Sequence, residues 1–235
     1  MAVARDSSSK EQSPGLLRGK PGPTQDDERR LWAAGFTLVA GIDEVGRGPI
    51  AGPVVAGAVV LPDLDGFDHG DLHLIRDSKT LSAAQLQRAN ALVCEIALGA
   101  ALGESSSDEI DALGIAPATR QAMRRALDGL PLVPTHLLID AFPLDWNRVA
   151  CTSIIKGDAL CTAISAASVI AKVYRDSVMR QMDVDYPGYG LAGHKGYASA
   201  DHLEAAARLG PSPIHRKSFS PFKPTLFDMT AQPES

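Results

Sequence analysis

The stretch Val39-Ala40-Gly41-Ile42-Asp43-Glu44-Val45-Gly46-Arg47-Gly48-Pro49 decides how the rest of the chain is interpreted. The apolar run over residues 36–42 predicts a strand that is buried on both faces. Two adjacent carboxylates, Asp43 and Glu44, stand at its end, and a Gly-Arg-Gly turn follows. Because burying an ionised carboxylate without a partner is costly, this position favours a divalent cation bound through carboxylate oxygens. These residues alone leave one alternative open, a solvated strand end beside Arg47.

The composition is that of an ordinary globular protein. The chain has 235 residues, of which 45% are hydrophobic and 22% charged, and its formal net charge is −5. This length suits one domain with an extra helical lobe, or two small domains. The negative charge argues against a protein that coats nucleic acid through bulk charge, but it is compatible with a local basic groove. There is no apolar run of membrane-spanning length, no signal-peptide core and no Cys-x-x-Cys pair, so we expect a cytoplasmic protein with reduced thiols.

Hydrophobic periodicity and turn residues predict a domain in which strands and helices alternate. We expect a disordered tail over residues 1–27, a folded domain over 28–222 and a frayed end over 223–235, because the tail has almost no large apolar residue. Strands are expected at about 36–43, 53–61, 97–104, 135–140 and 148–155. Helices are expected at about 26–34, 83–96, 108–113, 117–128, 159–182 and 199–209.

Four carboxylates share one kind of position, at or just past the end of a predicted strand. They are Asp43, Glu44, Asp140 and Asp158. If these strands are neighbours in one sheet, the carboxylates converge on one edge, where cations must offset their charge. Ligation by oxygen alone favours magnesium or manganese over zinc, and two such ions stabilise the attacking and leaving oxygens in phosphodiester cleavage. The alternative is that one or two of these acids cap helices or pair with Arg47, Lys79 or Lys156.

Other features point to a polyanionic ligand. Lys79 precedes a predicted helix start, where a phosphate finds a cation and free backbone amides, although a solvated lysine is the alternative. Tyr197 is suited to stacking on a sugar or base, with core packing as its alternative. Residues 151–220 contain eight basic and six acidic side chains, a net +2 in an acidic protein. His69 and His73 have helical spacing, but their loop composition argues against a zinc pair.

The motifs along residues 36–220 resemble ribonuclease HII, the bacterial type 2 ribonuclease H family. The resemblance rests on residues 41–49, 77–82, 138–140, 156–158, 164–176 and 194–197, which follow one another in the family's order. It implies an α/β, ribonuclease H-like fold with a central mixed sheet flanked by helices and a C-terminal helical extension. It implies a monomeric endonuclease that hydrolyses the RNA strand of RNA–DNA hybrids and cuts 5′ of single ribonucleotides in duplex DNA. The implied chemistry is two-metal hydrolysis with Mn2+ or Mg2+, giving a 3′-hydroxyl and a 5′-phosphate, and the implied role is ribonucleotide and primer removal in DNA repair.

The resemblance also implies roles for individual residues. The catalytic metal ligands are Asp43, Glu44, Asp140 and Asp158. Gly46, Arg47 and Gly48 correspond to the motif that reads the 2′-hydroxyl, and Tyr197 to the tyrosine that packs on the following deoxyribose. The expected phosphate contacts are Lys79, Lys172, Lys195, Arg216 and Ser218. The chain departs from the family at Arg76, where many relatives have asparagine, and over 141–149, but neither departure touches the four acids.

Two rival functions are weaker on the same residues. A different phosphodiester nuclease, such as a resolvase, would share the acids but would have no reason to combine Gly46-Arg47-Gly48 with Tyr197. A catalytically silent binding protein would be expected to have lost at least one of the four carboxylates, and all four are present. The related type 3 ribonuclease H is disfavoured because the polar N-terminal tail leaves no room for an extra binding domain.

Overall fold

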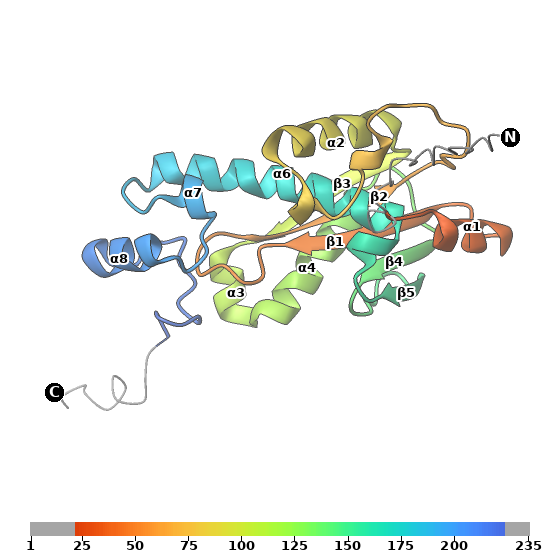
Figure 1. The fold of residues 1–235 in the computed structure, drawn as a ribbon. Coiled ribbons are helices and arrows are strands. Elements are labelled where there is room, and N and C mark those ends of the chain that lie inside the picture. The colour runs from red at the N-terminus through yellow and green to blue at the C-terminus, as the bar shows by residue number, and fades with distance from the viewer. Residues whose placement is uncertain (1–21, 224–235) are drawn as a thin grey trace, which may run out of the picture.

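A five-stranded mixed sheet forms the centre of the computed structural model, which describes residues 22–223 (Figure 1). Its strands, in the spatial order β3-β2-β1-β4-β5, are β1 Val39–Val45, β2 Val54–Val60, β3 Gly99–Ser105, β4 His136–Asp140 and β5 Ala150–Ile154. The first three form an antiparallel meander, whereas β4 runs parallel to β1 and β5 runs parallel to β4. The predicted mixed sheet is therefore confirmed.

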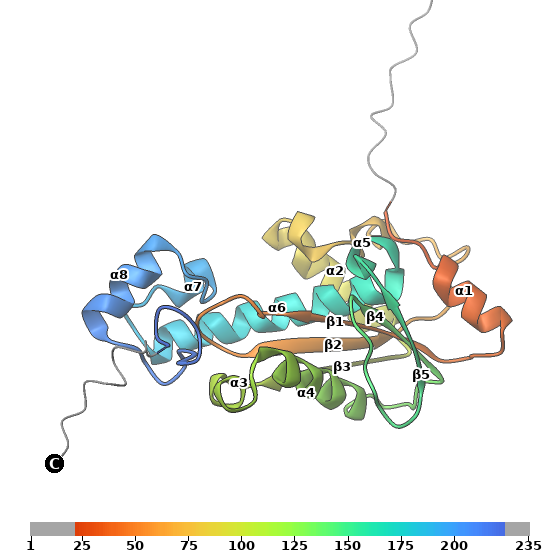
Figure 2. The same ribbon diagram turned by 90° about the horizontal axis from the view of Figure 1, so that it is seen from below.

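Helices cover both faces of this sheet. They are α1 Asp26–Ala33, α2 Ala83–Ile96, α3 Ser107–Leu113, α4 Ile115–Asp128, α5 Gly157–Leu160, α6 Thr162–Asp185, α7 Leu191–His194 and α8 Ala200–Leu209. The long α6 packs on β1 and β2 from one side, and α4 packs on β2 and β3 from the other (Figure 2). Beyond the end of the sheet, α7 and α8 gather around the C-terminal part of α6 and form the expected helical extension (Figure 1).

Small residues allow α6 to approach the sheet at backbone distance. A Cβ atom on Gly41 of β1 would lie 2.1 Å from the carbonyl carbon of Ala163, and one on Gly57 of β2 would lie 2.4 Å from the carbonyl oxygen of Ala167. Neither distance is compatible with a side chain, so both strands need glycine at these points. The close packing that the Ala- and Ser-rich sequence predicted for this helix is confirmed.

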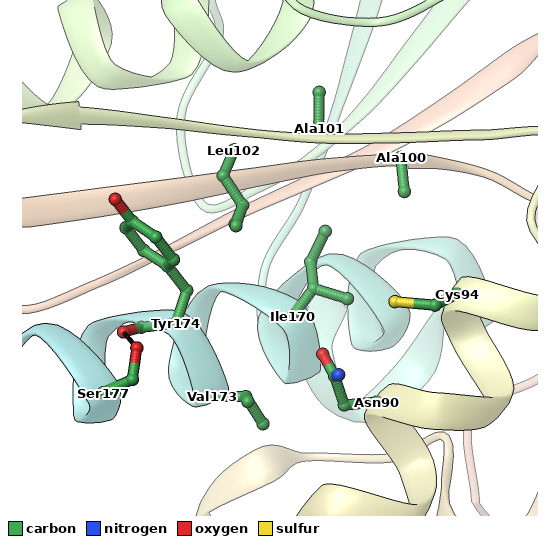
Figure 3. A pocket seen from close by; sticks show the side chains of 9 residues that line it. All are labelled: Asn90, Cys94, Ala100, Ala101, Leu102, Ile170, Val173, Tyr174 and Ser177. Carbon is green, nitrogen blue, oxygen red and sulfur yellow. Dashed lines mark hydrogen bonds between the residues drawn. The ribbon is translucent and has the colours of Figure 1, made fainter.

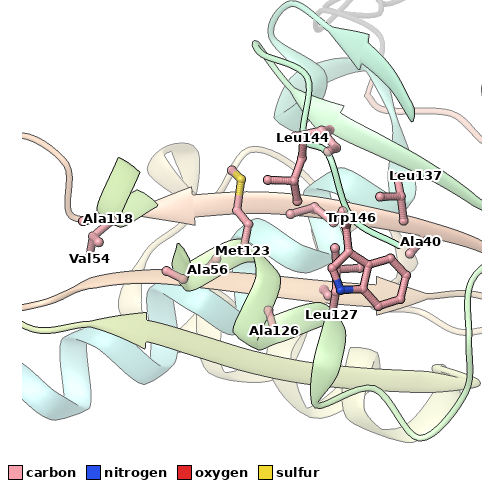
Figure 4. Packing of buried hydrophobic residues seen from close by; sticks show 14 of the residues in the cluster. Ala40, Val54, Ala56, Ala118, Met123, Ala126, Leu127, Leu137, Leu144 and Trp146 are labelled. Carbon is pink, nitrogen blue, oxygen red and sulfur yellow. The ribbon is translucent and has the colours of Figure 1, made fainter. Parts of the chain in front are cut away.

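The largest apolar cluster lies between the sheet and α4 (Figure 4). Met123 and Leu127 of α4 meet Ala40 and Leu137 of the sheet, and Trp146 closes the cluster from the loop between β4 and β5. The indole nitrogen of Trp146 donates a hydrogen bond to Asp128 Oδ1 at 2.7 Å, so its only polar atom has a partner. This core fixes β1 and β4 side by side, and three of the four acids singled out from the sequence stand near the ends of these strands.

Two expected boundaries are wrong. The tail predicted over 1–27 is too long, because Thr24 exchanges backbone hydrogen bonds with Leu160 and Thr162, both at 3.0 Å, and residues 1–21 lie outside the described part. The helix predicted over 159–182 is two helices, since Cys161 adopts an extended conformation between them. Thr24 satisfies backbone groups that this break exposes, which is the physical reason for both differences. The expected frayed end from 224 onward also lies outside the described residues.

No helix within residues 22–223 is long and apolar enough to cross a membrane.

Candidate active site

The four predicted acids stand on one edge of the sheet. Asp43 and Glu44 end β1, Asp140 ends β4, and Asp158 lies in α5, directly after β5. These strands are far apart in the sequence, but in the sheet β4 lies between β1 and β5 and is parallel to both. Because the carboxyl ends of parallel strands meet at the same edge, the four acidic residues lie near that edge.

Burial makes it costly in free energy to ionise the carboxyl groups at this edge. Asp43 is only 4% exposed, and burial together with the charges of Glu44 and Asp140 raises its pKa well above the ordinary value, although a hydrogen bond from Ser168 opposes the rise. Burial also raises the pKa of Glu44, and burial with the charge of Asp158 raises that of Asp140. Burial and the repulsion between neighbouring acids therefore both disfavour the ionised forms of these three carboxyl groups.

Two side-chain cations reach the acids from the rim. Lys79 Nζ donates to Asp158 Oδ2 at 2.9 Å, and Arg47 Nη1 donates to Glu44 Oε1 at 3.2 Å. The side chain of Lys79 is 76% exposed, so the pair with Asp158 is open to solvent on the lysine side. The local pairing that the sequence left as an alternative is therefore present for these two acids, but neither pair reaches Asp43 or Asp140.

The donor set fits a divalent cation. Glu44 Oε2 is buried without a hydrogen-bond partner among the described residues, so it remains free to bind a ligand. Asp43 Oδ1 and Asp140 Oδ1 each accept one backbone amide, from Glu44 and Gly157 respectively, both at 2.8 Å, which orients these carboxylates. In the described part of the chain, no three His, Cys, Asp or Glu side chains already converge on a single point, so a bound ion would have to draw the carboxylates together. Oxygen donors of this kind suit magnesium or manganese.

The Gly-Arg-Gly turn lies directly beside the acids. Gly46 has a φ of +91°, and a Cβ atom there would lie 2.1 Å from Arg175 Nε, so only glycine fits. The guanidinium of Arg47 lies 5.2 Å from the centre of the Phe142 ring, which supports the arginine from the β4–β5 loop.

Tyr197 stands against the same turn. Its ring is 50% exposed, and its Cε1 atom lies 3.6 Å from the position of a Cβ on Gly48. Core packing, the alternative that the sequence left open for Tyr197, is therefore wrong. The glycine turn and an exposed aromatic ring are adjacent, as a pair that reads two successive sugars would have to be.

The predicted phosphate contacts divide into accessible and inaccessible residues. Lys172 is partly exposed but its Nζ donates to Asp176 at 2.7 Å, and Lys195 lies on the Tyr197 loop. The Ser218 hydroxyl donates to Asp111 Oδ1 at 2.6 Å, which gives it an acidic neighbour. Arg216 is wrong as a phosphate contact, because it has no exposed surface and its donors are used by backbone carbonyls.

Sequence reasoning missed the residues that support the site from below. Ser168 on α6 contacts Asp43 and lies 3.0 Å from the Ser78 hydroxyl, oxygen to oxygen. Arg175, also on α6, lies beneath the turn. The available signal was polar residues within an otherwise apolar, small-residue helix, since such residues are buried only when they have partners.

A groove of about 360 Å3 between α2, α6 and β3 lies apart from this edge (Figure 3). Its walls are mainly apolar, with Leu102 and Ile170 facing Cys94 across it. Its lining residues include no carboxylate, histidine, lysine or arginine that could supply acid–base or metal chemistry.

The fold and the acidic edge together define a metal-dependent nuclease with a ribonuclease H-like fold. The family model for Ribonuclease HII matches residues 40–221. A ribonuclease HII of Dehalococcoides mccartyi is 44% identical over 201 residues, covering 86% of this chain and 94% of the relative. One of Levilactobacillus brevis is 46% identical over 201 residues, covering 85% and 75%. The chain belongs to the ribonuclease HII family.

Solved structures share the fold. The crystal structure of ribonuclease H2 from Pyrococcus horikoshii OT3 aligns with a TM-score of 0.65 and 26% identity, over 79% of this chain and 95% of that one. A Bst-RNase HIII in complex with Mn2+ aligns with a TM-score of 0.63 and 22% identity, over 79% of this chain and 68% of that one. The second similarity concerns the fold alone.

Proposed function

We propose that this nuclease hydrolyses the RNA strand of RNA–DNA hybrids and cuts on the 5′ side of single ribonucleotides embedded in duplex DNA. The products are a 3′-hydroxyl and a 5′-phosphate. The observation that carries the proposal is that the Gly46-Arg47-Gly48 turn and the exposed Tyr197 lie next to each other, beside the acidic edge. The role that follows is the removal of ribonucleotides and RNA primers from DNA, by a monomer in the cytoplasm.

Each part of the site has a chemical task in this proposal. Asp43, Glu44, Asp140 and Asp158 would hold Mn2+ or Mg2+, which when bound polarises the phosphodiester and supplies a nucleophile from water. Without side chains at its first and third positions, the turn lets its backbone approach a ribose, and the 2′-hydroxyl is what distinguishes RNA from DNA. An aromatic ring against the next sugar leaves no room for a second hydroxyl, which favours a ribonucleotide followed by a deoxyribonucleotide.

The remaining side chains orient the nucleic acid. Lys172 and Lys195 lie on the Tyr197 side of the turn, where a phosphate backbone would pass, and Lys79 lies beside Asp158 on the other side. Phosphate contacts fix register and carry no base information, so we expect cleavage to be independent of base sequence.

The test is cleavage of an end-labelled DNA duplex that contains one ribonucleotide, with Mn2+, with Mg2+ and with chelator. A single metal-dependent cut 5′ of the ribonucleotide supports the proposal. Cleavage restricted to a continuous RNA–DNA hybrid would retain the metal site but remove the junction role of Tyr197. No cleavage of either substrate would favour the silent binding protein.

Matched variants tie the result to the site. Asp43→Asn is expected to abolish cleavage, whereas Glu204→Gln, which changes an exposed acid on α8, should leave it unchanged. Wild-type cleavage by Asp43→Asn would refute the assignment of the acidic edge.

A further inference from the structure

Two arginines lie entirely inside the molecule beneath the Gly-Arg-Gly turn. Arg175 of α6 and Arg216 of the segment after α8 are both 0% exposed. Among residues 22–223, no carboxylate lies within ion-pair distance of either one. A guanidinium without an acidic partner is rare in a protein interior, because desolvation is costly unless hydrogen bonds replace water. The hydrogen-bond partners of the two guanidinium groups must therefore explain why they are buried.

Arg216 binds the turn through its carbonyl oxygens. Its Nη1 donates to the carbonyls of Arg47 and Pro49, at 3.0 and 2.7 Å. Its Nη2 donates to those of Gly46 and Gly52, at 2.6 and 2.8 Å, and its Nε donates to Gly52 at 3.0 Å. The whole fork of the guanidinium is thus used by one loop, and burial lowers the pKa of Arg216 to about 9, which leaves it charged at neutral pH.

Arg175 connects the same turn to the loop that carries Tyr197. Its Nε donates to the carbonyl of Pro53 at 2.9 Å and its Nη2 to that of Ala51 at 3.3 Å. Its Nη1 donates to the carbonyl of Lys195 at 3.0 Å, two residues before Tyr197. One rigid planar group therefore sets the separation between the turn and the aromatic ring.

The direction of these carbonyls fixes the direction of the amides. In a planar trans peptide, the C=O of one residue and the N–H of the next point in opposite directions. Since the carbonyls of Gly46 and Arg47 point inward at Arg216, the N–H groups of Arg47 and Gly48 point away from it. Two successive amide donors are thereby aimed away from the buried guanidinium.

We propose that Arg175 and Arg216 are positioning residues for ribonucleotide recognition, which hold the turn by its carbonyls so that the amides of Arg47 and Gly48 and the ring of Tyr197 face the substrate at a fixed separation. The inference rests on the proposed function, because it assigns a task to the turn in that reaction. It also accounts for Gly46, whose missing side chain makes room for Arg175.

The test uses the full chain with Arg216→Lys and Arg175→Lys, which keep the charge but lose the planar fork. The control is Met123→Ala, a cavity variant in the core on the other side of the sheet. The assay measures the affinity for a duplex with one ribonucleotide relative to an all-DNA duplex, in Ca2+, at a temperature where circular dichroism shows every variant folded. We expect the arginine variants to lose about tenfold or more of this preference, and the control to retain it.

Hydrogen exchange in the free protein provides a second readout that needs no substrate. Peptides over residues 46–53 should exchange faster in both arginine variants, whereas those over α4 should not. Wild-type preference together with unchanged exchange over 46–53 would overturn the inference. If the wild-type chain binds both duplexes equally, the proposed function fails, and so does the proposed role of the arginines in ribonucleotide recognition. The hydrogen-exchange result still decides whether the arginines hold the turn. If one variant does not fold, the other decides.

Discussion

Lowering the pH from 7 to 5 is expected to destabilise the fold by about 2 kcal/mol through His215 alone. His215 has no exposed surface, and its Nδ1 accepts a hydrogen bond from the Ser212 amide at 2.9 Å. Its proton therefore lies on Nε2, which is 3.1 Å from Nε2 of His202. His202 in turn donates from Nδ1 to the carbonyl of Tyr197 at 2.8 Å. A proton added to His215 Nδ1 would displace the hydrogen bond from the Ser212 amide, and one added to His202 Nε2 would face the N–H of His215, so both rings are better satisfied as neutral imidazoles.

The magnitude follows from the pKa of the buried ring. Burial, together with the neighbouring His202, lowers the pKa of His215 from 6.5 to about 4. Between these two pH values the unfolded chain binds a proton that the folded chain does not, so stability falls as the pH falls. The loss grows by about 1.4 kcal/mol for each pH unit and reaches about 3 kcal/mol below pH 4.

Urea unfolding followed by circular dichroism at pH 7, 6 and 5 measures this loss. His215→Gln will be less stable than wild type at pH 7, so the quantity to compare is the change of unfolding free energy with pH. We expect this change to be smaller in His215→Gln and unaltered in His73→Gln, which removes a histidine from an exposed position. Equal pH dependence in wild type and His215→Gln would refute the reasoning.

Three further predictions concern the site and its support. Mn2+ should raise the melting temperature of the wild-type chain but not that of Asp43→Asn, since an ion that binds only the folded state stabilises it; equal shifts would place the ion elsewhere. Tyr197→Ala should lose the preference for a ribonucleotide–deoxyribonucleotide junction in a cleavage assay while Tyr197→Phe keeps it, because the ring supplies the contact; unchanged selectivity in the alanine variant would contradict this role. Gly41→Ala should destabilise the fold by at least about 1–3 kcal/mol in urea, because its Cβ would meet the Ala163 backbone. A neutral effect would mean that α6 can move away from the sheet.

Local signals in the sequence were sufficient for the elements and for the acidic edge. The helix predicted over 83–96 has these bounds in the structure. It begins at a capping box, in which Ser82 Oγ accepts a hydrogen bond from the Gln85 amide and the Gln85 side chain accepts one from the Ser82 amide. The four acids were found because each stands at or just past the end of a segment with a strand-like sequence, although β5, the strand before Asp158, is largely exposed. The strand order that brings them together is not a local property, and the residues alone left it as a condition for the four acids to meet.

Burial of charge could not be predicted in the same way. Arg216 occurs in a basic segment, Arg216-Lys217, and its neighbour is exposed as expected. Only the folded loop of residues 46–53, more than 160 positions earlier in the chain, provides the carbonyl oxygens that make its burial favourable. The wrong prediction that Arg216 contacts a phosphate therefore has a physical origin. The local sequence shows that the segment is positively charged, but the groups that hydrogen-bond a buried charge come from distant parts of the chain.

This burial also changes what is expected of binding in salt. Without the buried Arg175, Arg216 and Asp158, residues 151–220 retain six basic against five acidic side chains, so the net charge of this region at the surface is +1 and not the +2 that the sequence indicated. The accessible candidates for phosphate contacts are Lys79, Lys172 and Lys195, and Asp176 already neutralises one of them.

With about three phosphate contacts, raising NaCl from about 50 to 200 mM should weaken duplex binding by about 40-fold, against about 10³-fold or more for a protein with six or more such contacts. Fluorescence anisotropy across this range measures the dependence. A loss near the larger value would mean that a basic surface outside these lysines binds the duplex.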